Sequence, residues 1–227
     1  MNWIKRYQLF LFDFDGLLVN TEELHYQAYI KMCSDRGYHL PWNFHRYSEA
    51  AHHSATGLRE QIYAEFPELH SEESNWDILY EEKKKAFLNY LQSGATQLMP
   101  GVTELLKALE EANIKRCVVT HSALPLIQTI RAQNAILDTI PNWITREDYS
   151  HPKPDPECYQ IAINRFANEN DQIIGFEDSP RGLNALLGTR AIPVLVCPPD
   201  YPYLNQVRKP HIKYFPSFTS IKDNNHP

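Results

Sequence analysis

The sequence predicts an α/β protein: a doubly wound parallel sheet with an all-helical domain inserted near its N-terminal end. The apolar run 9–12 ends in two aspartates and indicates a strand, over about residues 7–15, that is buried on both faces. Helical patterns without a convincing strand come next, and strand and helix patterns then alternate. We therefore expect a core domain made of residues 1–20 and 97–227, interrupted by a helical domain made of residues 21–96.

The inserted domain contains three helical patterns. The first begins at Thr21, where two acidic residues in the first turn favour a helix start, and ends before Gly37. The other two cover residues 56–66 and 75–91. The charged run 81–85 in the last pattern predicts a helix face exposed to solvent.

The remainder of the core domain is predicted as alternating strands and helices. The strands are predicted at residues 114–120, 143–144, 173–177 and 193–197. The helices are predicted at residues 102–112, 126–132, 156–166 and 180–187. Pro154 and Pro156 suit the entry to the helix predicted at residues 156–166. The tail after residue 198 gives no prediction of structure.

The composition is ordinary for a globular protein and argues against several functions. The chain has 227 residues, of which 43% are hydrophobic, and a formal net charge of -6. This acidic balance argues against a nucleic-acid-binding surface, and no segment is apolar for long enough to span a membrane. Four scattered cysteines without metal-ligand spacing predict free thiols in a reducing compartment. We expect a cytoplasmic protein that is a monomer or a weak homodimer.

Asp13 and Asp15 are the first candidate site residues. Because side chains alternate along a strand, these two carboxylates are expected on the same side at the end of the first strand. Two carboxylates this close need a cation or a shared proton, and Mg²⁺ prefers such oxygen ligands. Gly16 allows a sharp turn beside them. The alternative, a plain loop beginning at Asp13, is left open by this segment alone.

Polar residues also follow other predicted strands, at the edge where parallel sheets bind ligands. They are Thr120, His121 and Ser122 after the second strand, Lys153 before a helix, and Glu177 and Asp178 after the fourth strand. With Mg²⁺ these groups predict a phosphoryl-transfer site. An aspartate attacks phosphorus, the metal and the lysine spread the developing charge, and a second acid moves the proton.

Four segments of the chain resemble the four ordered motifs of the haloacid dehalogenase superfamily. They are residues 13–16 (Asp-Phe-Asp-Gly), 120–122 (Thr-His-Ser), 153–156 (Lys-Pro-Asp-Pro) and 175–182 (Gly-Phe-Glu-Asp-Ser-Pro-Arg-Gly). The chain is most similar to the phosphoglycolate phosphatase and β-phosphoglucomutase branch, in which a helical cap follows the first motif. The resemblance covers nearly the whole chain and implies a Rossmann-like core with a helical cap domain.

The resemblance implies a role for each matching residue. Asp13 would be the nucleophile that forms an aspartyl-phosphate. Asp15 would be the general acid/base and would offer the metal its backbone carbonyl. Lys153 would bridge the nucleophile and the phosphate. Mg²⁺ would be the cofactor, with Asp178 as a direct ligand and Glu177 as a direct or water-mediated one.

Other matching residues concern phosphate binding. Thr120 and the adjacent backbone would hold the phosphoryl group, with Ser122 as a further candidate. His121 stands where the family more often has a small or amide residue, so it either bonds the phosphate or shapes the loop. Asn20 replaces a commonly acidic residue, and residues 188–191 match the family only loosely. None of these departures removes a catalytic group, but they leave the substrate open.

Residues 51–59 occupy the place of the family's substrate-reading cap loop. Arg59, His52 and His53 are therefore candidates to meet a second anionic group of the substrate. The alternative is that Arg59 pairs with a helix acid and that both histidines are exposed to solvent.

The sequence favours a Mg²⁺-dependent phosphatase that acts on a small phosphorylated metabolite and binds neither nucleic acid nor membrane. A β-phosphoglucomutase-like sugar-phosphate mutase is the alternative enzyme, because it would use the same groups. A dehalogenase is disfavoured, since its chemistry needs one aspartate and no metal. A non-catalytic binding protein that retained the fold is the alternative of another class, against which the intact acids and Lys153 argue.

Overall fold

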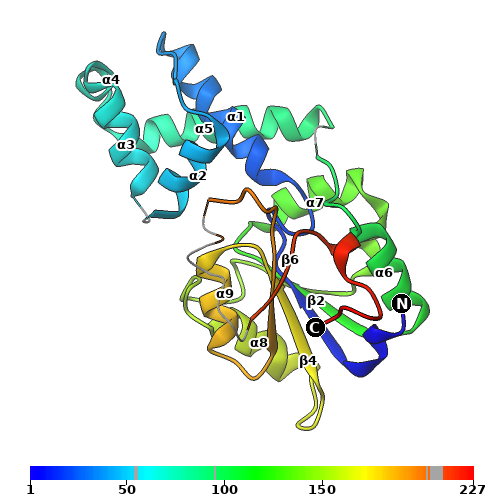
Figure 1. The fold of residues 1–227 in the computed structure, drawn as a ribbon. Coiled ribbons are helices and arrows are strands. Elements are labelled where there is room, and N and C mark those ends of the chain that lie inside the picture. The colour runs from blue at the N-terminus through cyan, green and yellow to red at the C-terminus, as the bar shows by residue number, and fades with distance from the viewer. Residues whose placement is uncertain (54–55, 95, 203, 205–211) are drawn as a thin grey trace. The chain divides into compact units, whose positions relative to one another are not determined.

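The structure, a computed structural model, describes residues 1–53, 56–94, 96–202, 204 and 212–227. The chain forms two compact units (Figure 1). One, the core unit, consists of Met1–Asn20 and Gln97–Pro227, and the other, the helical unit, consists of Thr21–Thr96.

The core unit is built on a six-stranded sheet in which every strand pair is parallel. The strand order is β3-β2-β1-β4-β5-β6. The strands are β1 (Leu9–Phe12), β2 (Lys115–Val119), β3 (Asn142–Ile144), β4 (Ile173–Glu177), β5 (Ile192–Val196) and β6 (Lys213–Phe215). The order reverses on either side of β1, which confirms the doubly wound α/β class predicted from the sequence.

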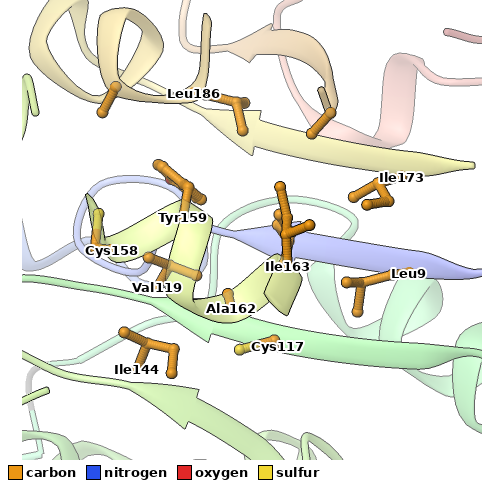
Figure 2. Packing of buried hydrophobic residues seen from close by; sticks show 13 residues of the cluster. Leu9, Cys117, Val119, Ile144, Cys158, Tyr159, Ala162, Ile163, Ile173 and Leu186 are labelled. Atoms are coloured by element: carbon orange, nitrogen blue, oxygen red, sulfur yellow. The ribbon is translucent and has the colours of Figure 1, made fainter. Parts of the chain in front are cut away.

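Helices cover both faces of this sheet. They are η1 (Trp3–Arg6), α6 (Val102–Glu111), α7 (Leu124–Gln133), η2 (Ala135–Thr139), α8 (Glu157–Phe166), α9 (Pro180–Leu187) and η3 (Phe218–Ser220). Leu9 and Leu11 of β1 pack in one cluster with α8 and α9, and Figure 2 shows Tyr159 and Ile163 of α8 in that cluster. The alternate residues of β1 face the other side, where the ring of Phe12 stacks on Phe176 at 5.4 Å.

In its described residues, the helical unit consists of five helices around an aromatic core. They are α1 (Thr21–Asp35), α2 (Phe44–His53), α3 (Gly57–Glu65), α4 (Pro67–Glu72) and α5 (Trp76–Gln92). One face of α1 is buried, and its residues Tyr29 and Met32 join the core of the unit. The side chain of Asn75 accepts from the backbone N–H of Asp77 and caps α5 at the predicted start.

Several element boundaries differ from the predictions. The first strand ends at Phe12 instead of continuing to Asp15, because the chain turns at Gly16 with a φ of 80°. The segment 51–59, expected as a loop, includes the last residues of α2 and the first of α3. Strand β6 lies in the tail that gave no prediction, since three residues at a sheet edge carry little periodicity.

The prediction of a fully solvated face for residues 81–85 is wrong for Lys83. Only 3% of its surface is exposed, and its ammonium lies 2.6 Å from Nδ1 of His25 on α1. The same ammonium lies 5.0 Å from the ring centre of Tyr29 and 5.1 Å from that of Phe87. Cation–π contacts of this kind make burial of a lysine less unfavourable, and a charge pattern alone does not reveal them.

Candidate active site

The core unit places Asp13 at the carboxyl edge of the sheet, one residue beyond β1. Its backbone N–H donates to the carbonyl of Phe176 at 3.0 Å, so pairing with β4 continues to this residue. The turn that follows is closed by Gly16, whose N–H donates to the carbonyl of Val19 at 2.8 Å. Asp13 is buried by this arrangement, with 9% of its surface exposed.

Lys153 joins Asp13 to Glu177. Its ammonium donates to Asp13 Oδ1, to Glu177 Oε1 at 2.7 Å and to the carbonyl of Val119 at 3.0 Å. Arg181 Nη2 donates to the backbone carbonyl of Lys153 at 2.7 Å and so helps to fix the loop that carries the lysine. Because both carboxylates are buried, the ammonium offsets part of the cost of removing them from water.

Tyr159, which the sequence analysis did not select, completes this group. Its ring belongs to the apolar cluster of Figure 2, and its hydroxyl donates to Glu177 Oε1. The hydroxyl oxygen lies 3.2 Å from Lys153 Nζ, which itself lies 4.9 Å from the centre of the ring. The hydroxyl of a buried tyrosine usually needs a hydrogen-bond partner. The position of Tyr159 on the apolar face of a predicted helix was therefore the one feature of the sequence that could have indicated a role in the site.

The protonation of these groups is interdependent. Burial, opposed by Lys153 and reinforced by the Glu177 and Asp15 carboxylates, raises the pKa of Asp13 to about 8. Burial would lower the pKa of Lys153, but the carboxylates of Asp13 and Glu177 hold it well above its ordinary value. Burial and the Glu177 carboxylate raise the pKa of Tyr159, so its hydroxyl keeps its proton and donates.

Thr120 and Ser122 are brought together with Asp15. Both hydroxyls donate to Asp15 Oδ2, Thr120 at 3.2 Å and Ser122 at 2.6 Å. The backbone N–H of Ser122 donates to Thr120 Oγ1 at 3.0 Å, which fixes the loop after β2. These two hydroxyls therefore orient the Asp15 carboxylate in this structure.

His121 lies in this loop, between Thr120 and Ser122, with an exposed side chain. Its Nδ1 is 2.8 Å from the hydroxyl of Tyr149, and that hydroxyl is 3.1 Å from the carbonyl of Thr120. Partial removal of water by neighbouring protein atoms lowers the pKa of His121, and the positive charges of Arg146 and Arg181 lower it further. Neither arginine was predicted as a site residue, because Arg146 lies outside the four motifs and Arg181 is one of several polar residues within the last.

Three carboxylates fit a divalent cation. Asp13, Glu177 and Asp178 each offer a carboxylate oxygen, and these oxygens lie within 4.8 Å of one another. All three residues are buried. Among the described residues, Oε2 of Glu177 has no hydrogen-bond partner although it is buried, so its acceptor capacity is available to a ligand. A hard cation prefers a compact set of oxygen ligands of this kind.

Gly182, in the first turn of α9, lies against the Glu177 carboxylate. A Cβ at position 182 would overlap both oxygens and the carboxyl carbon of Glu177. The N–H of Gly182 donates to Oγ of Ser179 at 3.1 Å, which caps the helix. Glycine is therefore required here so that the helix can begin directly behind the carboxylate.

The predicted substrate-reading residues belong to the helical unit. Arg59 lies on α3 with an exposed side chain and lines an open hollow together with Tyr63, Trp76 and Asp77. The side chains of His52 and His53, at the end of α2, lie outside the described residues. Their roles in reading the substrate stay predictions.

The fold and the site together define an α/β protein whose parallel sheet ends in a buried group of carboxylates around one lysine. The chain belongs to the haloacid dehalogenase-like hydrolase family, whose model matches residues 10–190. Within the part of the chain that the structure describes, no helix combines the length and the apolar character needed to cross a membrane.

Individual relatives are similar over most of the chain. The chain is 26% identical to protein CbbY of Cereibacter sphaeroides over 186 residues, which cover 78% of this chain and 79% of the relative. It is 29% identical to probable pseudouridine-5'-phosphatase of Drosophila melanogaster over 209 residues, which cover 88% and 85%. The crystal structure of CbbY from Rhodobacter sphaeroides in complex with phosphate has a TM-score of 0.71 at 22% identity, covering 93% of this chain and 95% of that one. The structural match supports the fold.

Proposed function

We propose that the protein is a Mg²⁺-dependent phosphatase that hydrolyses a small phosphorylated metabolite through an aspartyl-phosphate. The observation that carries this proposal is the ion pair of Asp13 and Lys153 beside the carboxylates of Glu177 and Asp178. An aspartate in this position can attack phosphorus while the ammonium offsets the charge of the phosphoryl group. The Drosophila relative is named a probable phosphatase, which supports the same class of reaction.

The proposed reaction has two steps. In the first, an oxygen of Asp13 bonds to phosphorus while the P–O ester bond breaks, and Asp15 gives a proton to the leaving oxygen. In the second, water bonds to phosphorus, Asp15 takes its proton, and the bond to Asp13 breaks to release inorganic phosphate. The hydroxyls of Thr120 and Ser122 on Asp15 Oδ2 would hold the acid in place for both proton transfers.

Asp13, Glu177 and Asp178 would hold Mg²⁺, with the backbone carbonyl of Asp15 as a further ligand. The ion would supply positive charge that offsets the negative charge of the phosphoryl group. Lys153 would balance the remaining charge on Asp13 and the phosphoryl oxygens.

The proposal predicts phosphate release from a panel of small phosphate esters, measured with Mg²⁺ and after removal of the metal by EDTA. We expect turnover of one or more esters with Mg²⁺ and a loss of roughly 10²-fold or more with EDTA, restored by adding Mg²⁺. Metal-independent turnover would contradict the proposed cofactor. A third outcome is conversion of a sugar 1-phosphate that depends on a catalytic bisphosphate and releases no net phosphate. That outcome would show that the protein is a mutase and not a phosphatase.

Metal binding is expected to depend on pH through Asp13. Burial raises the pKa of Asp13 to about 8, so protons compete with the metal for this carboxylate below that pH. The affinity for Mg²⁺ should therefore rise by at most about tenfold per pH unit up to pH 8 and then level off. Calorimetric titration between about pH 6 and pH 9 measures this. Asp13→Asn should flatten the profile, and an unchanged slope in that variant would contradict the assignment.

A further inference from the structure

The two carboxylate oxygens of Glu177 differ in their hydrogen-bond partners. Oε1 receives an N–H from Lys153 at 2.7 Å and the O–H of Tyr159. Oε2 is buried and has no hydrogen-bond partner among the described residues. The two donors on Oε1 occupy its lone pairs, so Oε2 is the oxygen that can still bind a cation.

Lys153 cannot hold this arrangement alone. Its ammonium has three protons and four acceptors within reach, and the three closest, Asp13 Oδ1, Glu177 Oε1 and the Val119 carbonyl, account for the protons, whereas the Tyr159 hydroxyl is the most distant at 3.2 Å. The hydroxyl of Tyr159 therefore contributes its own proton to Glu177 instead of serving mainly as an acceptor for the lysine. Tyr159 is fully buried on α8, and its ring belongs to the apolar cluster that α8 forms with the sheet, so the hydroxyl is fixed by the core.

We propose that Tyr159 is a positioning residue for the metal site: its hydroxyl holds Glu177 Oε1 so that Oε2 is presented to the cation. The inference rests on the proposed metal-dependent function and adds to it a residue outside the four motifs. Without the hydroxyl, Oε1 has one donor instead of two, and the carboxylate can rotate and exchange its oxygens. Ligands that lose such an orienting hydrogen bond bind their metal less tightly.

The test is Tyr159→Phe, which removes one oxygen atom and keeps the ring in the apolar cluster. We expect the dissociation constant for Mg²⁺, measured by calorimetric titration with MgCl₂, to rise about tenfold. The Mg²⁺ concentration for half-maximal turnover should rise by the same factor, whereas kcat at saturating Mg²⁺ should stay within about threefold of wild type. The matched control is Tyr7→Phe, which removes a tyrosine hydroxyl that donates to the Pro227 carbonyl at 2.8 Å, and it should leave Mg²⁺ affinity unchanged.

A double variant shows whether Tyr159 acts through Glu177. In the Glu177→Gln background, Tyr159→Phe should have no further effect on Mg²⁺ affinity, because the positioned carboxylate is gone. Tyr159→Phe that melts at a lower temperature but binds Mg²⁺ as tightly as wild type would overturn the inference and leave the proposed function intact. Wild-type protein that binds no Mg²⁺ would overturn the proposed metal and this inference with it.

Discussion

Asp13→Asn is expected to lower kcat for phosphate ester hydrolysis by roughly 10⁴-fold or more. The amide nitrogen and oxygen keep the size of the side chain, but neither is a nucleophile that can form the proposed aspartyl-phosphate. Asn at this position can still accept a hydrogen bond from Lys153, so the fold should persist. Steady-state release of phosphate from the best ester of the panel measures the loss, and the circular dichroism spectrum measures the fold.

The matched control for this variant is Asp35→Asn. Asp35 is an exposed residue at the end of α1, where it pairs with Lys31 on the same helix. Its change to asparagine should leave kcat within about twofold of wild type, because exposed ion pairs contribute little. If Asp13→Asn hydrolysed the ester as fast as this control, Asp13 would not be the nucleophile.

The sequence was sufficient to predict β1 to β5, because these strands are short apolar runs bounded by turns and helices, whereas β6 was not predicted. Phe12 and Phe176, which stack in the structure, lie in two of those runs, and the acidic residues Asp13 and Asp178 follow directly after these two strands. Parallel strands bring their carboxyl ends to one edge, so the meeting of Asp13 with Glu177 followed from topology. The contact of Asp13 with Lys153 needed in addition the resemblance to known motifs, since this lysine follows no strand directly. The contact of Lys153 with Glu177 was not predicted.

Other parts of the site were beyond sequence reasoning because they depend on side-chain packing across long distances in the chain. Tyr159 resembles any apolar residue of a helix until its hydroxyl is seen to donate to Glu177. Arg146 and His121 are brought near one another by the loops after β3 and β2, whose paths no periodicity predicts. Lys83 in the helical unit is a further example. Its charged neighbours in the sequence predict a side chain exposed to solvent, but in the structure its ammonium lies close to the aromatic rings of Tyr29 and Phe87.

Lys153→Met is expected to separate metal binding from catalysis. Loss of the ammonium leaves the buried carboxylates of Asp13 and Glu177 without their cation, so the free energy of unfolding without metal should fall by about 3 kcal/mol. Mg²⁺ should bind as tightly as in wild type or more tightly, because one positive charge has left the site. The kcat should nevertheless fall about 10³-fold or more, since the lysine no longer balances the charge of the phosphoryl group. Denaturant titration, calorimetry and phosphate release measure the three quantities.

Lys115→Met is the control that makes these losses interpretable. Lys115 is a half-exposed lysine of the same sheet, 3.6 Å from Asp171, and its loss should cost less than about 1 kcal/mol and leave kcat unchanged. If Lys153 only stabilised the fold, Lys153→Met would recover its turnover once Mg²⁺ had restored its stability. Because the ammonium contacts the proposed nucleophile itself, we expect the stability to recover with Mg²⁺ while the turnover does not. Recovery of both would show that the cation alone suffices for phosphoryl transfer and that Lys153 has no catalytic role.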